Sequence, residues 1–250
     1  MMGTESLVAL TALIFVAALL YASVGHAGAS GYLAAMALFG VAPEMMKPTA
    51  LALNVLVSMI ATVKFYRAGC FSWRIFWPFA LASIPFAFIG GFVSLPGWIY
   101  KPIVGIVLLY TAFLLLKGKV AAASVHVGKP PLAPALGAGA GIGLLSGLTG
   151  VGGGIFLSPL LLLKGWAEIR QTSGVAAAFI LVNSIARLLG LMTSKPHFPE
   201  ALPLWAIAAV VGGFIGAEYG SRRLATPTIQ RLLALVLAIA GSKMILTATL

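Results

Sequence analysis

The sequence predicts an all-α polytopic membrane protein of about ten helical segments, arranged as two inverted repeats of five, with broken or short helices at segments 2 and 7. Of its 250 residues, 61% are hydrophobic and 8% are charged, whereas soluble domains carry about 25% charged residues. Apolar stretches fill nearly the whole chain, which leaves no room for a soluble domain. The two halves also share an ordered series of glycine and threonine residues.

Charged residues, prolines and glycines divide the chain into apolar segments. The first follows Met1–Ser6, which contains no basic residue, so we expect it to be retained as a helix and not cleaved as a signal. A spanning helix needs about 20 residues, so the second and seventh segments are too short to cross alone. In chain order, the segments cover residues 6–23, 29–39, 48–65, 75–95, 101–116, 132–149, 154–164, 172–193, 202–220 and 229–249.

The longest polar interval separates two similar halves. We therefore expect one membrane repeat at 1–116, a cytoplasmic linker at 117–131 and a second membrane repeat at 132–250. Five segments per half is an odd number, so the halves are expected to insert in opposite orientations. Matching residues recur in the same order, with a spacing that shrinks from 125 to 122: Gly25 with Gly150, Gly28 with Gly153, Gly40 with Gly165, Thr49 with Thr172, and Gly90 with Gly212.

Basic residues predict the orientation, because Lys and Arg concentrate in short cytoplasmic loops. With the N-terminus outside, the odd-numbered loops hold 11 of the 16 basic residues: Lys64, Arg67, Arg74, Lys117, Lys119, Lys129, Lys164, Arg170, Arg222, Arg223 and Arg231. The others are Lys47, Lys101, Arg187, Lys195 and Lys243. We therefore expect both termini on the periplasmic side of a bacterial inner membrane. Topology thus accounts for the net charge of +11, which would suggest nucleic-acid binding in a soluble protein.

A glycine-rich stretch, Gly147–Pro159, dominates the second half. It places five glycines within eight residues, a density that is unfavourable inside a helix. We expect a break in the helix here, followed by the N-terminus of a short helix. Free N–H groups and the positive end of the helix dipole would make Gly150, Gly152, Gly153 and Gly154 an anion site. The alternative is close helix packing, the role that we expect for a seam of Gly212, Gly216 and Gly220.

Polar residues inside apolar helices are the other candidates. Asn54 and Ser58 share one face of the third segment, and Asn183 and Arg187 share one face of the eighth. A polar face turned to lipid is costly, so both faces are expected to point inward. For Asn54 and Ser58, hydrogen bonds between helices and contact with substrate are both consistent with the sequence.

Arg187 and His26 each leave two interpretations open. A buried Arg187 would need an anionic partner; otherwise its side chain snorkels to the interface. His26 lies in the first glycine loop, where it is either a satisfied structural residue or a group that relays protons or binds an anion. Glu218 and Arg222, four residues apart, are expected to form an ion pair.

Several kinds of chemistry are missing from the sequence. It contains no Walker A motif, no His-Glu-x-x-His zinc pair, no Gly-x-Ser-x-Gly nucleophile motif and no clustered metal ligands. We therefore expect no metal, no cofactor and no enzymatic reaction. A single cysteine, Cys70, excludes an internal disulfide, and five carboxylates are too few to favour a cation site. These absences favour a protein that binds and moves a small anion.

The second glycine motif resembles that of a known family. Gly150-Val-Gly-Gly-Gly-Ile-Phe-Leu-Ser-Pro-Leu160, with Gly165 and Thr172-Ser173 after it, resembles the repeated motif of the TauE/SafE membrane permeases. The first half has Gly25-His-Ala-Gly-Ala-Ser30, which departs from the triple glycine. The resemblance implies transport, mostly export, of sulfur-containing anions such as sulfite, sulfoacetate and other organosulfonates.

We therefore predict a secondary transporter that holds an anion between two short helices and works by alternating access. The expected partners are a small anionic substrate and membrane lipid, with no nucleic acid, in a monomer or homodimer. If protons are coupled to transport, His26 is the expected titrating group. An anion channel and a membrane-embedded enzyme are the alternatives. The expected substrate-binding residues are Gly25, His26, Gly28, Ser30, Asn54, Ser58, Gly150, Gly152, Gly153, Gly154, Thr172, Ser173, Asn183 and Arg187.

Overall fold

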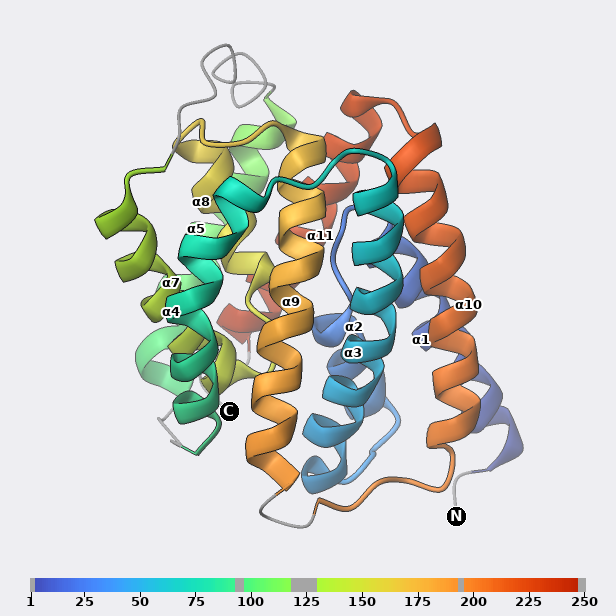
Figure 1. The fold of residues 1–250 in the computed structure, drawn as a ribbon. Helices are drawn as coiled ribbons and strands as arrows, with labels where there is room; N and C mark the ends of the chain where they lie inside the picture. Colours follow the sequence, from blue (N-terminus) through green and yellow to red (C-terminus); the bar gives the residue numbers. More distant parts are fainter. Residues whose placement is uncertain (1–2, 93–96, 118–129, 193–195, 247–250) are drawn as a thin grey trace.

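The computed structural model describes residues 3–92, 97–117, 130–192 and 196–246. These residues form helices and contain no β-strand (Figure 1). The predicted linker at 117–131 lies mostly outside the described residues, as do Lys119, Lys129 and Lys195. The helices are α1 (Thr4–Ala22), α2 (Ala29–Leu38), α3 (Pro43–Arg67), α4 (Trp73–Phe92), α5 (Gly97–Leu116), α7 (Leu132–Thr149), α8 (Gly154–Leu163), α9 (Ile169–Met192), α10 (Leu202–Glu218), the π-helical turn η1 (Tyr219–Arg223) and α11 (Thr226–Leu246).

Seven of the helices are long and apolar enough to cross a membrane. They are α1, α3, α4, α7, α9, α10 with its π-helical turn, and α11. By contrast, α2 and α8 have 10 residues each, about half the length that a crossing requires. The chain is thus a multi-pass membrane protein, and the prediction that segments 2 and 7 are short is confirmed.

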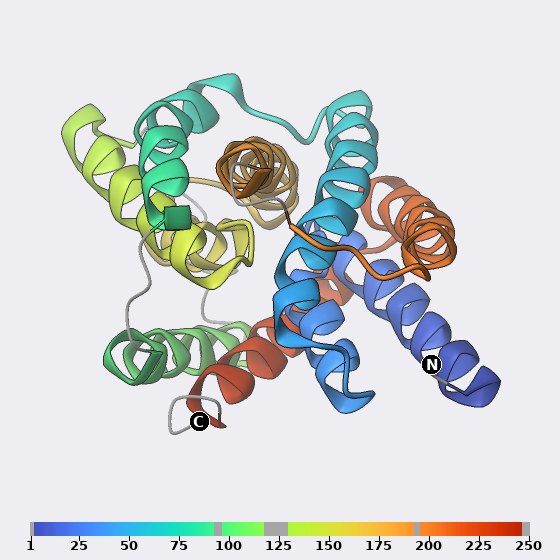
Figure 2. The ribbon, with the colours of Figure 1, turned by 90° about the horizontal axis from the view of Figure 1, so that it is seen from below.

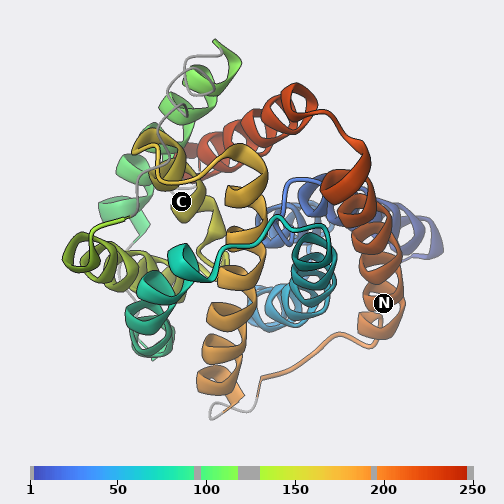
Figure 3. The same ribbon diagram turned by 45° about the horizontal axis from the view of Figure 1, so that its top comes forward.

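The helices pack in pairs that join distant parts of the sequence. Helix α4 packs against α7, α1 against α10, and α5 against α11. Seen from below, α3 and α9 lie between the α4–α7 pair and the α1–α10 pair (Figure 2). Helix α9 also contacts α4 and α8, so it touches elements from both halves (Figure 3).

Rows of glycines allow the two helices within each outer pair, α1–α10 and α4–α7, to approach each other closely. A Cβ at Gly212 or Gly216 of α10 would overlap the carbonyl oxygen of Phe15 or Leu19 in α1, and a Cβ at Gly220 of η1 that of Ser23, which directly follows α1. The predicted glycine seam is therefore confirmed as a packing surface. On α7, Gly139, Gly143 and Gly147 face the backbone of α4 at Phe79, Ser83 and Ala87 in the same way.

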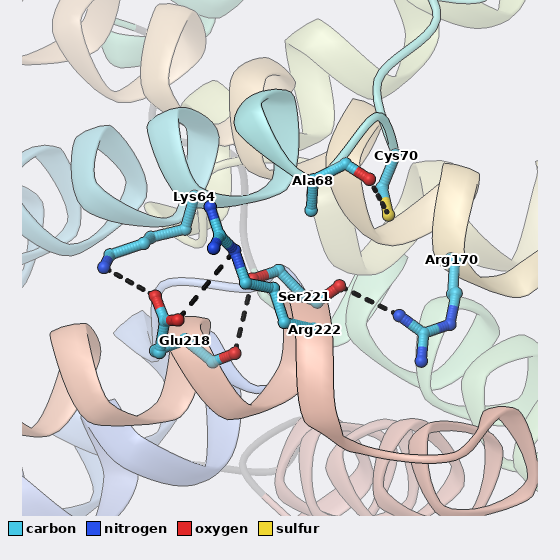
Figure 4. Close-up of polar contacts among 7 residues, drawn as sticks. All are labelled: Lys64, Ala68, Cys70, Arg170, Glu218, Ser221 and Arg222. Atoms are coloured by element: carbon cyan, nitrogen blue, oxygen red, sulfur yellow. Dashed lines mark hydrogen bonds and ion pairs between the residues drawn. The ribbon is translucent and has the colours of Figure 1, made fainter.

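Charged side chains gather at one end of the bundle, which also holds the α3–α4 and α10–α11 connections (Figure 1). The predicted Glu218–Arg222 pair is present, with Arg222 Nε 3.8 Å from Glu218 Oε1. Lys64 of α3 lies nearer, with Nζ 2.6 Å from Glu218 Oε2 (Figure 4). Arg170 of α9 donates hydrogen bonds to the carbonyl oxygens of Ser221 and Leu224, where the π-helical turn ends. These contacts tie α3 and α9 to α10.

Candidate functional site

The second glycine loop interrupts the chain between α7 and α8. Gly150, Gly152 and Gly153 have φ angles of 78°, 78° and 79°, in the left-handed region that residues with a Cβ rarely adopt. This backbone path ends α7 at Gly150 and begins α8 directly after Gly153. Gly154 is helical, but a Cβ there would lie 2.5 Å from Ile180 Cδ1. The predicted break is thus present, and it is buried inside the bundle (Figure 1).

The first glycine loop repeats two of the positive-φ glycines of the second loop. Gly25 and Gly28 have φ angles of 73° and 96°, and α2 begins directly after Gly28. A Cβ at Gly25 would overlap the carbonyl oxygen of Ser173 in α9, so the backbones of the loop and the helix touch. His26 and Ala27 occupy the positions between the two glycines, where the second loop has Val151 and Gly152.

His26 joins the two glycine loops. Its ring is 1% exposed, and Nδ1 donates to the Val24 carbonyl oxygen at 3.1 Å. On the other side, Nε2 lies 3.3 Å from Ser158 Oγ of α8, and the ring also interacts with the backbone of Gly154. Residues far apart in the sequence, 25–28 and 150–154, are therefore neighbours in the fold.

Both short helices begin with unsatisfied donors. Within the described residues, no backbone carbonyl accepts from the N–H groups of 27–30 or 152–155, and no side chain caps α2 or α8. Both N-termini are buried. A buried helix start without partners normally finds a ligand, and its dipole favours a negative one. The geometry is suited to binding an anion.

Asn54 and Ser58 have different surroundings, although they share a face of α3. Ser58 donates to the Asn54 carbonyl oxygen of its own helix at 2.5 Å, so its hydroxyl is satisfied locally. The Asn54 side chain is fully buried, and neither its Nδ2 nor its Oδ1 has a hydrogen-bond partner among the described residues. A Cβ at Gly152 would lie 3.0 Å from Asn54 Nδ2, which places the amide beside the second glycine loop.

Asn183 and Arg187 also separate on α9. Asn183 accepts from Ser83 Oγ of α4 at 2.7 Å and donates to Phe179 O at 2.8 Å, so its amide links two helices. Arg187 is 5% exposed and donates from Nη1 to Ser146 O at 3.0 Å, at the last turn of α7. A Cβ at Gly150 would lie 3.3 Å from the same nitrogen. The guanidinium thus lies within the protein, at the second glycine loop.

The remaining candidates lie near the first loop or on α9. Ser30 shares a 2.7 Å hydrogen bond with Tyr21, and its carbonyl accepts from Lys243 Nζ at 2.9 Å. Ser173 donates to the Ile169 carbonyl at 3.2 Å, whereas Thr172 Oγ1 is buried without a partner among the described residues. Four of the predicted site residues therefore already have side-chain hydrogen bonds within the protein: Ser30, Ser58, Ser173 and Asn183.

Ser184 is a residue of this region that sequence reasoning missed. Its side chain is fully buried on α9, and Oγ has no partner among the described residues. A Cβ at Gly152 would lie 3.1 Å from that oxygen. The sequence offers one signal for it: Ser184 follows Ile180 by four residues, and Ile180 also packs on the second loop.

No group of three or more His, Cys, Asp or Glu residues that could hold a metal is present in the described part of the chain.

A match to known proteins covers nearly the whole sequence. Residues 10–244 match the family model described as sulfite exporter TauE/SafE.

Two relatives carry names of the same kind. The chain is 44% identical over 247 residues to the probable membrane transporter protein y4hK of Sinorhizobium fredii, covering 98% of this chain and 100% of that protein. It is 25% identical over 207 residues to the probable membrane transporter protein MJ0441 of Methanocaldococcus jannaschii, covering 76% of this chain and 74% of that protein. A search of the solved structures gives no match. The chain belongs to the TauE/SafE family of membrane transporters.

Proposed function

We propose that this protein is a secondary transporter that exports a small oxyanion, sulfite or an organosulfonate such as sulfoacetate, by alternating access. One observation carries the proposal: α2 and α8 begin with buried, uncapped N–H groups, and His26 links the two starts. Desolvated donors at the positive ends of two helix dipoles attract negative charge. The anion is held between these starts.

The same geometry favours transport over catalysis. Discontinuous helices whose N-termini point at an anion are a recurring arrangement in secondary transporters. The printed names of both relatives describe membrane transporters, and the family model describes a sulfite exporter. The sulfur-containing substrate and the export direction come from that family likeness, whereas the negative charge comes from the helix starts.

Alternating access rests on two inverted repeats, residues 1–116 and 132–250. Three glycine pairs at a spacing of 125 support the repeat: Gly25 and Gly150, Gly28 and Gly153, and Gly40 and Gly165 share positive φ. Helix packing supports it too. If α1 corresponds to α7 and α4 to α10, the α1–α10 and α4–α7 pairs become equivalent. Rocking of one repeat against the other would expose the anion to each side in turn.

The charged end of the bundle supports the proposed orientation in the membrane. Lys64, Arg170 and Arg222 gather around the ends of α3 and α10 (Figure 4), opposite the end where the chain begins (Figure 1). Basic residues favour the cytoplasmic side, so the termini of this transporter would face the periplasm of a bacterial cell. Proton coupling, if present, would act through His26.

Reconstituted vesicles test the proposal. Purified protein is inserted into liposomes loaded with sulfite or sulfoacetate, and efflux is followed with and without a pH gradient. We expect saturable efflux that exceeds that of empty liposomes. Uptake of acetate and taurine serves as the selectivity control. Ion currents without saturation would identify a channel instead, and no efflux of any anion would refute the proposal.

A further inference from the structure

We infer that Asn54 and Ser184 form, with the backbone at Gly152, an oxyanion-binding subsite that holds oxygen atoms of the substrate. This inference rests on the proposed anion transport and adds to it the side chains that bind the oxygens. It places those contacts at the second glycine loop and not evenly between the two loops.

Three elements bring these groups together. Asn54 comes from α3, Ser184 from α9, and Gly152 from the loop that precedes α8. A Cβ at Gly152 would lie 3.0 Å from Asn54 Nδ2 and 3.1 Å from Ser184 Oγ, so both polar atoms face the same short piece of backbone. Because any side chain at position 152 would fill this space, the glycine keeps the polar atoms close to the loop.

The lack of partners is the second, independent observation. Asn54 and Ser184 are both 0% exposed, and their side-chain polar atoms have no hydrogen-bond partner in the described residues. Leaving a buried polar group unpaired is costly, so such groups usually serve a ligand or bind water. Asn183, the neighbour of Ser184, shows the contrast, since both ends of its amide are hydrogen-bonded within the protein.

The chemistry of the three groups fits an oxyanion. The Asn54 amide and the Ser184 hydroxyl can each donate, and so can the backbone N–H groups at the start of α8. Nδ2 is the Asn54 atom that lies beside Gly152, so the amide presents its donor to the loop. Several donors with fixed directions suit a group with two or three oxygen atoms, such as sulfite, sulfonate or carboxylate, better than a spherical halide. Arg187, beside Gly150, supplies the nearby positive charge.

A matched pair of serines provides the test. Ser184 and Ser83 are both fully buried, but only Ser83 has a side-chain partner in the described residues, Asn183 Oδ1 at 2.7 Å. We expect Ser184→Ala to weaken sulfite binding about tenfold, because one hydrogen bond to a charged ligand is lost, with little change in melting temperature. Ser83→Ala is expected to lower the melting temperature and leave sulfite affinity unchanged.

Sulfite titrations of the purified protein in detergent, followed by calorimetry and by thermal unfolding, measure both quantities. Asn54→Leu adds a second variant, since it keeps the approximate volume of the side chain while removing the amide donor. We expect it to weaken sulfite binding about tenfold, and chloride to compete weakly with sulfite.

The outcomes separate the two proposals. If the unmodified protein binds no sulfite, sulfoacetate or acetate, the proposed function and the subsite both fail. If the unmodified protein binds sulfite while Ser184→Ala and Asn54→Leu bind it within twofold of the same affinity, the subsite is wrong and anion transport still stands. Chloride that competes as strongly as sulfite would also overturn the oxyanion assignment.

Discussion

The two glycine loops share positive φ at two pairs of corresponding glycines but differ in what surrounds them. In the first loop, Gly25 lies against the backbone carbonyl of Ser173 and Gly28 against the ring of Tyr32 in the following helix. The second loop meets side chains: Gly150 faces Arg187, and Gly152 faces Asn54 and Ser184. A loop fixed against backbone acts as a scaffold, whereas a loop lined by polar side chains can recognise a ligand. We therefore expect the first loop to contribute mainly to stability and the second mainly to recognition.

The largest expected effect is a loss of stability at the first loop. Gly25→Ala combines left-handed strain with overlap of the Ser173 backbone, and we expect it to lower the free energy of unfolding by about 2–5 kcal/mol. Gly40→Ala is the matched control, because Gly40 has a φ of 67° and nothing within 4 Å of a Cβ. In Gly40→Ala, the new Cβ causes left-handed backbone strain but no steric overlap, and we expect the free energy of unfolding to fall by about 1–2 kcal/mol. Equal losses in thermal unfolding of the two variants would remove the special role of the first loop.

The next effect is a loss of binding at the second loop. In Gly153→Val, a Cβ would lie 2.9 Å from Phe179 Cε1 and 3.3 Å from Ser146 Oγ, at a φ of 79°. We expect the protein to insert but to bind sulfite more than about a hundredfold more weakly, because the loop cannot keep its path. Gly141→Val on α7, where a Cβ meets nothing within 4 Å, is the control for a helical glycine. Full transport by a well-folded Gly153→Val protein would contradict the assignment.

Arg187 tests whether charge at the second loop contributes to recognition. We expect Arg187→Met to weaken sulfite affinity about tenfold, because the guanidinium beside Gly150 is lost, and Arg187→Lys to weaken it less. Arg231→Met, on the exposed face of α11, controls for the loss of one positive charge. Titration calorimetry measures all three variants. Unchanged affinity in Arg187→Met would limit Arg187 to holding the end of α7 through Ser146.

The smallest effect concerns the contact between the loops. His26 and Ser158 are expected to couple by about 0.5–1.5 kcal/mol in a double-mutant cycle of unfolding, as one buried hydrogen bond does. The variants His26→Ala, Ser158→Ala and their combination supply the cycle. A coupling of zero would show that the loops are neighbours without supporting each other. The buried Tyr21–Ser30 pair, within the first half, gives a reference value.

Sequence periodicity predicted the helices well because long apolar runs and glycine breaks are local signals. The segment expected at 132–149 coincides with α7, and that at 154–164 differs from α8 by one residue. Start positions were less accurate where polar residues belong to the helix. Helix α3 begins at Pro43, five residues before the predicted start at 48, because proline suits the first turn of a helix.

The partners of the polar residues could not be predicted in the same way. Helical spacing placed Asn183 and Arg187 on one face, yet Asn183 bonds to α4 and Arg187 to α7. Spacing also grouped Asn54 with Ser58, although Ser58 is satisfied by its own helix. Which residue stays unpaired depends on the neighbouring helices, and these come from distant parts of the chain. For the same reason, Ser184 was missed.

The α1–α10 pair has a consequence for biogenesis. Phe15 and Leu19 meet Gly212 and Gly216 backbone to backbone, so the main neighbour of α1 is a helix that follows it only after most of the intervening helices. Most of the chain must be synthesised before that contact can form. Until then, the surface of α1 that fits Gly212 and Gly216 has no α10 to pack against. Late joining of such distant segments is slow, because their ends must first find each other.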